Sequence, residues 1–379
     1  MSALRVGMFT ECYRPIRNGI VTSLEALVTA LRARGDEAVV VTPEMPGFRD
    51  DSCEVVRIPS LPLPTRSAYR LALPYVPRDL GALSIVHTHS PFVTGWLGAL
   101  TARRARIPLV FTYHTQLEEY AHYVPFEAHA TRSAATQLTR SYANGTDAVI
   151  VPTASMERHL RELGVHTRID VVPSGIDVAA FAAGKRSDAV RARLGARSGE
   201  ALVLCVGRLG REKNVELAIE AFARLQLPSA RLAIVGDGPH RELLQRHAAR
   251  MGVAGRTSFA REFAHDALPD AYASCDAFVF TSRSETQGLV LVEALAAGAS
   301  VIALDTPQTR DVLAGAGRLV ANDSAALAGA LRDTLLGRIA NPALGARVAR
   351  SYDGIVVGER VADVYRSLLG TGRELAAAR

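Results

Sequence analysis

Two glutamates eight positions apart, Glu285 and Glu293, occur in the segment SETQGLVLVEALAAG at residues 284–298. The residues after Gly288 predict a helix, and the first amides of a helix have no partner inside it and favour an anion. Glu293 lies about one helical turn beyond Leu289, on the same face. Because an ionised carboxylate is costly to bury alone, we expect a ligand to be the partner of Glu293. The segment predicts a site that takes an anion at the helix start and hydroxyl groups at the two carboxylates.

The segment VGRLGREKN at residues 206–214 carries two cations, Arg208 and Lys213, in a loop between a predicted strand and a predicted helix. Arginine offers a bidentate fork and lysine a mobile point charge, a combination that suits a diphosphate. A solvent-exposed charged loop is the alternative. Of the 44 basic residues only two are lysine, the other being Lys185, and this scarcity favours a specific role for Lys213.

Several glycine turns follow predicted strands. Asn18-Gly19 precedes a predicted helix, where a glycine lets backbone approach a ligand closely, although an ordinary turn needs the same pair. Gly207 and the VGDGP turn around Gly236 end two further strands, and the loop ending at Phe263 follows another. The VGDGP turn and the Phe263 loop could each present backbone to a planar base. Since no G-x-G-x-x-G fingerprint is present, we expect no dinucleotide cofactor.

Three histidines, His87, His89 and His114, stand at the carboxyl ends of predicted strands. They come from different strands and lack the spacing of helical metal ligands, so a metal site is disfavoured. We expect His114 to line the ligand cleft and to hydrogen-bond a sugar or an acceptor. His87 and His89 are expected to shape the loops, and His89 is kept as a candidate acceptor contact.

The elements that must position these residues alternate along the whole chain. Continuous apolar runs such as RVGMF, EAVVV, AVIV, ALVLCV and RLAIV are typical of buried parallel strands, and amphipathic helical patterns separate them. The alternation breaks at IDVVPSGID, residues 169–177, and then starts again. The pattern predicts two doubly wound, Rossmann-like α/β domains, residues 1–175 and 176–358, that face each other across a cleft.

Bulk properties agree with a two-domain globular protein. A chain of 379 residues with 48% hydrophobic residues is too long for one ordinary core. The longest apolar stretch, residues 289–304, is interrupted by Glu293 and is shorter than the roughly 20 residues of a membrane span. The N-terminus lacks a signal-peptide pattern, and four scattered cysteines predict reduced thiols in a cytoplasmic protein.

The net charge of +6 is concentrated in one segment, residues 57–106, where seven arginines stand against the single acid Asp79. The arginines are Arg57, Arg66, Arg70, Arg78, Arg103, Arg104 and Arg106. Such a patch predicts contact with anionic lipid headgroups, chiefly through Arg66, Arg70, Arg103 and Arg104, with a solvated basic face as the alternative. No nucleic-acid reading motif accompanies the patch, so we expect no nucleic-acid partner.

The motifs in their order along the chain resemble those of family 4 retaining glycosyltransferases of the GT-B fold. They are Asn18-Gly19, HTHSPF, TYHT, VPSGID, GRLGREKN, VGDGP and SETQGLVLVEALAAG. The resemblance implies that Arg208, Lys213 and the amides of Gly288 and Leu289 hold the donor diphosphate. It also implies that Glu285 binds the transferred sugar and that Glu293 binds the ribose. His114 would lie near the sugar, and Gly19 would face the phosphate or the acceptor. A C-terminal helix at residues 359–379 is expected to rejoin the first domain, and no metal or other cofactor is expected.

Within this family, YRLALP, HTHSPFVTGWLGA, FTYHTQLEEYAHY and SETQGL look most like diacylglycerol glucosyltransferases. That resemblance implies transfer of a hexose, glucose from UDP-glucose, to a lipid such as diacylglycerol, at the inner face of the cell membrane. The alternatives are a soluble acceptor (a polysaccharide, a cyclitol or another small molecule) and GDP-mannose-dependent mannosyl transfer. An isomerase that acts on the nucleotide-sugar alone and a noncatalytic sugar-nucleotide sensor are further alternatives.

Overall fold

The computed structural model describes residues 3–50, 54–63, 69–77, 79–119, 128–261, 263–337 and 342–377. The chain divides into two compact units, Met1–Gly175 with Gly354–Arg379 and Ile176–Asp353. We call them the first unit and the second unit. The chain therefore passes from one unit to the other twice, between residues 175 and 176 and between residues 353 and 354.

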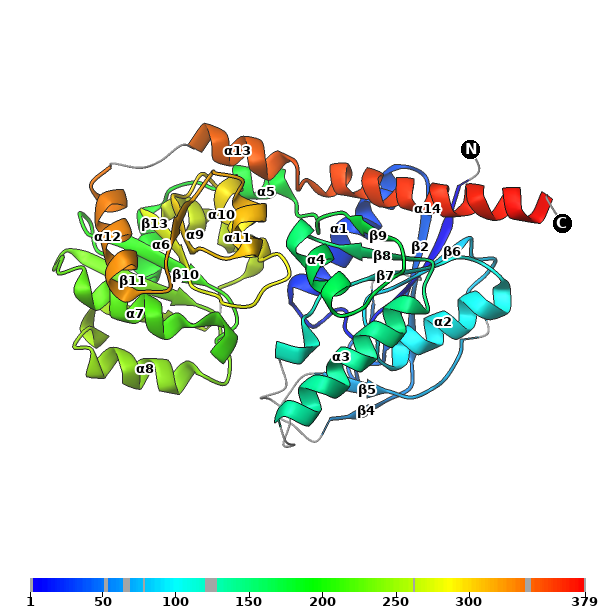
Figure 1. The fold of residues 1–379 in the computed structure, drawn as a ribbon. Helices are drawn as coiled ribbons and strands as arrows, with labels where there is room; N and C mark the ends of the chain where they lie inside the picture. Colours follow the sequence, from blue (N-terminus) through cyan, green and yellow to red (C-terminus); the bar gives the residue numbers. More distant parts are fainter. Residues whose placement is uncertain are drawn as a thin grey trace. The chain divides into compact units, whose positions relative to one another are not determined.

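The first unit is built on a seven-stranded parallel sheet with the order β3-β2-β1-β6-β7-β8-β9 (Figure 1). Its strands are β1 (Arg5–Phe9), β2 (Glu37–Pro43), β3 (Val55–Ile58), β6 (Ile85–Thr88), β7 (Leu109–Thr112), β8 (Ala148–Val151) and β9 (Ile169–Val171). In the register, Val6 lies opposite Ala38 of β2 and Ile85 of β6. These central strands are apolar and buried along their length, as expected of a sheet covered on both faces.

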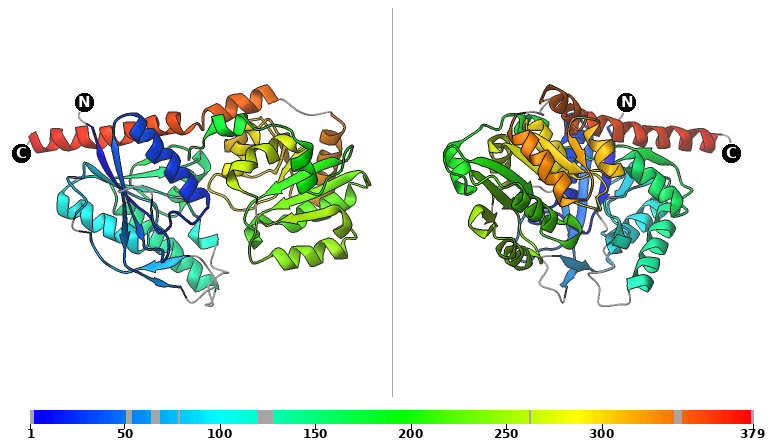
Figure 2. Two further views of the ribbon diagram at one scale, coloured as in Figure 1. Left: turned by 180° about the vertical axis from the view of Figure 1, so that it is seen from behind. Right: turned by 60° about the vertical axis from the view of Figure 1, so that its left-hand side comes forward.

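The described residues of the first unit also form five α-helices: α1 (Gly19–Ala33), α2 (Val93–Ala105), α3 (Ala128–Asn144), α4 (Ala154–Glu162) and α14 (Gly354–Ala377). In Figures 1 and 2 the C-terminal helix α14 runs beside α1. The approach is close at Gly358, where an added Cβ would lie 2.3 Å from the Cβ of Ala30. Val361 and Tyr365 bury the same face of α14 in the core of this unit.

A small antiparallel hairpin, β4 (Ser60–Pro62) and β5 (Arg70–Ala72), interrupts the alternation in the first unit. Leu61 and Leu71 face each other across the hairpin and are both exposed, whereas Ala72 packs in one core cluster with Leu97 of α2. The sequence analysis did not predict this hairpin, because its strands are too short and too rich in proline to show a period of two.

The second unit contains a six-stranded parallel sheet with the order β12-β11-β10-β13-β14-β15. Its strands are β10 (Ala201–Val206), β11 (Ala230–Val235), β12 (Thr257–Ala260), β13 (Ala277–Phe280), β14 (Val301–Leu304) and β15 (Arg318–Val320). The longer helices are α7 (Val215–Arg224), α8 (Arg241–Arg250), α10 (Leu289–Ala296), α12 (Ser324–Leu335) and α13 (Pro342–Arg350). Shorter helices are α5 (Val178–Ala182), α6 (Asp188–Arg193), α9 (Leu268–Ser274) and α11 (Pro307–Leu313).

Both sheets reverse their strand order at the first strand of the unit. β1 lies between β2 and β6, and β10 lies between β11 and β13. In open parallel sheets, ligands bind at the carboxyl ends of the strands beside such a switch point. The doubly wound fold class is confirmed by these two sheets and by the solved structures described below. Within the described residues, no helix is both long and apolar enough to cross a membrane.

Candidate active site

Two glycines fix the carboxyl ends of β10 and β11 in the second unit. Gly207 has φ 152° and Gly236 has φ 134°, values that side chains other than glycine rarely adopt. The two residues are also pressed together, since a Cβ on Gly236 would lie 2.0 Å from the carbonyl oxygen of Gly207. The backbone conformation and the close approach are therefore enough to explain glycine at both positions. That either glycine contacts a ligand remains a prediction.

The loop after β10 brings both predicted cations to this edge of the sheet. Lys213 forms an ion pair with Glu285, which lies in the loop after β13, and both side chains are largely buried. Arg208 pairs with Glu212 at 3.2 Å and is half exposed. The structure thus brings three of the predicted catalytic residues to adjacent loops of one unit.

Glu212 was missed by the sequence analysis, although it lies between the two cations in sequence. Its side chain is buried, and its main-chain oxygen accepts the N–H of Arg283 at 3.0 Å and the hydroxyl of Ser282 at 3.2 Å. These bonds tie the loop after β10 to the loop after β13. The position of Glu212 directly before Lys213, a candidate diphosphate-binding residue, was the signal in the sequence that could have identified it.

The predicted anion site at the start of α10 has the expected local geometry. Gly288 is the N-cap of α10, with φ 82°, and Leu289 is the first helical residue. A Cβ on Gly288 would lie 3.0 Å from the ring of Phe280, so the position tolerates glycine best. Because glycine has no side chain, the first-turn amides of α10 receive no cap of the kind that serine or asparagine provides.

A small cavity of about 20 Å³ lies at the same edge of the second unit. Its lining comes from β10 and from the loops after β10 and β13, and includes Gly207, Arg208, Lys213 and Ser282. Cations and backbone thus line a space beside the switch point of this sheet, where the fold is expected to bind a ligand.

Glu293 has a protein partner, which corrects the expectation that a ligand must supply one. The side chain is buried in α10, and its Oε2 accepts the hydroxyl of Tyr272 at 2.8 Å. Burial raises the pKa of Glu293 to about 7, and the hydrogen bond from Tyr272 opposes that rise. Tyr272 was missed because it lies 21 residues away on α9, and no local pattern marks it.

Phe263, the candidate base contact, lies in the loop after β12 and is partly buried against the core of the second unit. The guanidinium of Arg193 lies over its ring, 4.7 Å from the centroid. One face of the ring therefore already has a cationic neighbour within the protein.

The three histidines form a cluster at the carboxyl edge of the first sheet. His87 bridges Tyr365 of α14 and Thr112 of β7, with both hydrogen bonds 2.6 Å long, which agrees with its expected structural role. Its ring packs on that of His89, with centroids 4.4 Å apart. His89 Nδ1 in turn lies 2.9 Å from His114 Nε2.

Burial keeps these histidines uncharged near neutral pH. It lowers the pKa of His87 to about 3 and that of His114 to about 4, and it holds the pKa of His89 well below its usual range. The cluster therefore offers neutral imidazole nitrogens, which can exchange hydrogen bonds with hydroxyl groups but do not attract an anion.

Gly19 is the first residue of α1, and its neighbour Asn18 is the N-cap. The Asn18 side chain accepts the N–H of Val21 at 2.9 Å and donates to the hydroxyl of Tyr69 at 2.9 Å. The Asn-Gly pair therefore serves the helix start directly, and a ligand contact of Gly19 remains a prediction.

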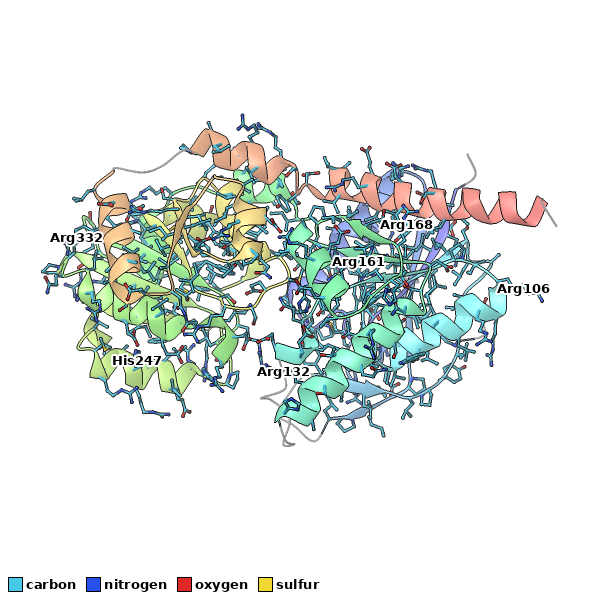
Figure 3. The ribbon with its side chains drawn as sticks, in the orientation of Figure 1. Arg106, Arg132, Arg161, Arg168, His247 and Arg332 are labelled. Atoms are coloured by element: carbon cyan, nitrogen blue, oxygen red, sulfur yellow. The ribbon has the colours of Figure 1, made fainter. Side chains whose placement is uncertain are left out.

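The arginine-rich segment is less uniformly available than its sequence suggests. Arg57 forms a two-pronged ion pair with Asp50, and Arg70 is bound to Ser60 within the hairpin. Arg103 and Arg104 are exposed at the end of α2, beside Arg106, which Figure 3 labels there. Arg66 and Arg78 lie outside the described residues.

Across the described chain, no group of three or more acidic, histidine or cysteine residues is arranged to hold a metal ion.

Comparison with known proteins agrees with this fold. Residues 17–180 match the family described as Glycosyltransferase Family 4, and residues 186–348 match Glycosyl transferases group 1. An alpha-monoglucosyldiacylglycerol synthase of Streptococcus pneumoniae is 31% identical, over 82% of this chain and 73% of that protein. A GDP-mannose-dependent alpha-mannosyltransferase of Mycobacterium tuberculosis is 32% identical, over 83% of this chain and 82% of that protein.

Among solved structures, that of the Anabaena protein HepE in complex with UDP and glucose superposes with a TM-score of 0.76. It is 20% identical and covers 96% of this chain and 100% of that one, so the likeness concerns the fold. The two parallel sheets and their solved neighbours show the GT-B fold, and the family matches along most of the chain identify a glycosyltransferase. The chain belongs to glycosyltransferase family 4, as its motifs indicated.

Proposed function

We propose that this enzyme transfers a hexosyl group from a nucleotide-diphosphate sugar to a lipid hydroxyl, with retention of the anomeric configuration. The observation that carries the donor half is the Lys213–Glu285 ion pair in the loops beside the start of α10. A cation, a carboxylate and unpaired helix amides are the groups that a sugar diphosphate requires together.

The second unit supplies donor chemistry in this proposal. Lys213, Arg208 and the amides of Gly288 and Leu289 stabilise the diphosphate as the bond between the anomeric carbon and the phosphate oxygen breaks. The leaving oxygen keeps the electron pair, and the acceptor oxygen forms the new bond on the same face of the sugar. The acceptor proton passes to a phosphate oxygen of the leaving group, and Glu285 holds hydroxyl groups of the sugar.

The first unit supplies acceptor chemistry. Its neutral His89–His114 pair suits an uncharged hydroxyl better than an anionic group. The likeness to an alpha-monoglucosyldiacylglycerol synthase over most of both chains supports glucose as the sugar and diacylglycerol as the acceptor class. The donor in this proposal is UDP-glucose, as the resemblance of the motifs implies. The similar identity to a GDP-mannose-dependent enzyme makes mannosyl transfer the second candidate.

Peripheral contact with an anionic membrane is part of the proposal. Seven of the large apolar side chains that the described structure exposes fall between residues 61 and 100: Leu61, Tyr69, Leu71, Tyr75, Phe92, Trp96 and Leu100. Phe92, Trp96 and Leu100 recur every four residues along α2, so they share one face with the exposed Arg103 and Arg104. Apolar side chains beside cations fit the interface of an anionic bilayer.

A donor and acceptor screen tests the transfer reaction. The purified protein is incubated with UDP-glucose or GDP-mannose and diacylglycerol, and products are resolved by mass and by the anomeric coupling in NMR spectra. We expect an α-linked glucolipid from UDP-glucose with the unaltered protein, a strongly reduced yield with Lys213→Ala, and a normal yield with Lys185→Ala, which changes the one other lysine of the chain. If a lipid product formed with GDP-mannose and not with UDP-glucose, the result would favour mannosyl transfer. If the donor were consumed in the absence of any acceptor, the result would contradict a transfer reaction.

Sedimentation with vesicles tests the membrane contact separately. We expect binding to vesicles that contain phosphatidylglycerol, loss of binding on combining Trp96→Ala with Arg103→Glu and Arg104→Glu, and no loss with Arg246→Glu and Arg250→Glu on α8. Equal sedimentation of the two charge-reversed proteins would exclude the α2 surface. Absence of binding by the unaltered protein would point to a soluble acceptor.

A further inference from the structure

We propose that Tyr272 is a positioning residue for the donor ribose: it holds one carboxylate oxygen of Glu293 and leaves the other for the ribose hydroxyls. This inference rests on the proposed function, in which Glu293 binds the ribose of a nucleotide-diphosphate sugar. It adds a residue from a different helix to the donor site.

The hydroxyl of Tyr272 is held in place by the packing of its ring. Tyr272 lies on α9, is fully buried, and packs between Phe181 at 5.9 Å and Phe278 at 5.4 Å, measured between ring centroids. Its hydroxyl donates to Glu293 Oε2 at 2.8 Å. Because the ring has aromatic neighbours from α5 and from β13, the hydroxyl is fixed relative to α10.

The two oxygens of Glu293 are used differently. Oε2 accepts from Tyr272, and this is the one hydrogen bond to the carboxylate of Glu293 among the described residues, so Oε1 receives none there. A carboxylate can accept up to four hydrogen bonds, so the arrangement leaves capacity for the two hydroxyls of a ribose. Without the hydroxyl of Tyr272, the same carboxylate would be buried with no donor from the protein.

The neighbours of Glu293 bring no second charge close to it. Burial and the Tyr272 hydrogen bond are the influences on its pKa, which is raised to about 7. The elements packed on α10, with the residues that flank them, carry the titratable or charged side chains Asp270, Tyr272, Cys275, Asp177, Arg310, Asp311, Arg347, Arg350 and, two residues after α13, Tyr352. Arg310 is paired with Asp305, and Arg347 and Arg350 point to solvent.

Removal of the Tyr272 hydroxyl should therefore act through the protonation of Glu293. The hydrogen bond from Tyr272 opposes the rise in the pKa of Glu293, so its loss raises that pKa further. At pH 7 more of the Tyr272→Phe protein then carries a neutral Glu293, which binds ribose hydroxyls less strongly. At pH 9 the carboxylate ionises again and binding recovers. The hydroxyl of Tyr272 itself stays protonated there, because burial holds the pKa of Tyr272 well above its usual value.

The experiment is calorimetric titration of UDP and of 2′-deoxy-UDP between pH 6 and pH 9. We expect Tyr272→Phe to bind UDP about tenfold more weakly at pH 7 and within about threefold of the unaltered protein at pH 9. The preference for UDP over 2′-deoxy-UDP should shrink in parallel. Tyr352→Phe is the matched control, since Tyr352 is buried in the same core cluster but donates to the carbonyl of Val312.

A loss of affinity in Tyr272→Phe that is equal at all pH values, or that Tyr352→Phe reproduces, would overturn the inference while leaving the proposed function intact. Unchanged UDP binding by Tyr272→Phe would overturn it as well. If the unaltered protein bound neither UDP nor GDP, the proposed donor site itself would fail, and the inference with it.

Discussion

The carboxyl edges of the two parallel sheets share one topology and carry opposite chemistry. In the first unit this edge holds the buried His87 and His89 and the partly exposed His114, all neutral near pH 7. In the second unit it holds the ion pairs Lys213–Glu285 and Arg208–Glu212. The strand order therefore fixes where ligands bind, and the loops fix which ligands bind. The charged edge suits an anionic donor, and the uncharged edge suits a hydroxyl acceptor.

The helix starts at the two edges differ in the same direction. At α1 the side chain of Asn18 accepts a hydrogen bond from the amide of Val21, as expected of a good N-cap. At α10 the N-cap is Gly288, which has no side chain to cap the first turn, and the amide of Leu291 donates to the main-chain oxygen of Gly288. Only the second arrangement resembles an anion site, which supports our proposal that the diphosphate binds in the second unit.

Loss of the Lys213 ammonium should give the largest effect, because in the proposed function it removes the charge that faces the leaving diphosphate. We expect Lys213→Ala to lower kcat/KM about 10²–10³-fold, the range found when one transition-state charge partner is removed. Lys213→Arg should recover little, since a planar fork does not replace a point charge. Steady-state kinetics with the labelled donor measure both, with circular dichroism as the check on folding.

The Lys213–Glu285 pair sharpens this prediction. Glu285→Ala should also lower kcat/KM strongly, but the double variant should lose less than the product of the two single losses, because each residue is the partner of the other. Strictly multiplicative losses would mean that the two side chains act independently when donor is bound. Near-normal turnover of either single variant would remove that residue from the mechanism.

His114→Ala should give a smaller effect and one confined to transfer, about 10–100-fold in kcat/KM for the acceptor, with nucleotide affinity unchanged. Because the pKa of His114 is lowered to about 4, activity at saturating donor should show no histidine titration between pH 6 and pH 8. A step near pH 6.5 that disappears in the variant would show instead that His114 acts in its charged form.

Glu293→Gln should separate stability from donor binding in the second unit. The pKa of Glu293 is raised from 4.5 to about 7, so between these values the folded protein keeps a proton that the unfolded chain has released. The stability of the unaltered protein therefore falls as the pH rises through this window, by about 3 kcal/mol in total. Glu293→Gln should be more stable by about this amount at pH 8 and equal near pH 4, while UDP affinity falls.

Chemical unfolding at the two pH values measures this difference. The glutamine still accepts the Tyr272 hydrogen bond, so a stability gain that is the same at both pH values would place its origin in packing and not in the buried charge. Equal stability of both proteins at pH 8 would show that Glu293 is ionised at low cost.

What the sequence could predict follows from how local each signal is. Strands such as Ala201–Val206 and the helix at Leu289–Ala296 are contiguous patterns, and Gly288 marks its own helix start. The Lys213–Glu285 pair joins residues 72 positions apart, and the Tyr272–Glu293 bond joins two helices. Such contacts depend on how loops and helices pack across the sheet, which periodicity does not encode. The hairpin of β4 and β5 was not predicted from the sequence, because its strands are local but too short to show a period of two.

Gly19→Ala should have the smallest effect and gives a clean test of the last predicted contact. Gly19 is helical, so alanine costs no backbone strain and improves helix propensity, and stability should rise by up to about 1 kcal/mol. If Gly19 faces phosphate or acceptor, the added methyl group should still lower transfer by about threefold to tenfold. Asn18→Ala is the contrasting variant, because it removes the cap and should cost about 1 kcal/mol of stability. A Gly19→Ala protein that is more stable and fully active would restrict the role of the Asn18-Gly19 pair to starting α1, and would leave the second unit as the place where backbone amides meet the donor.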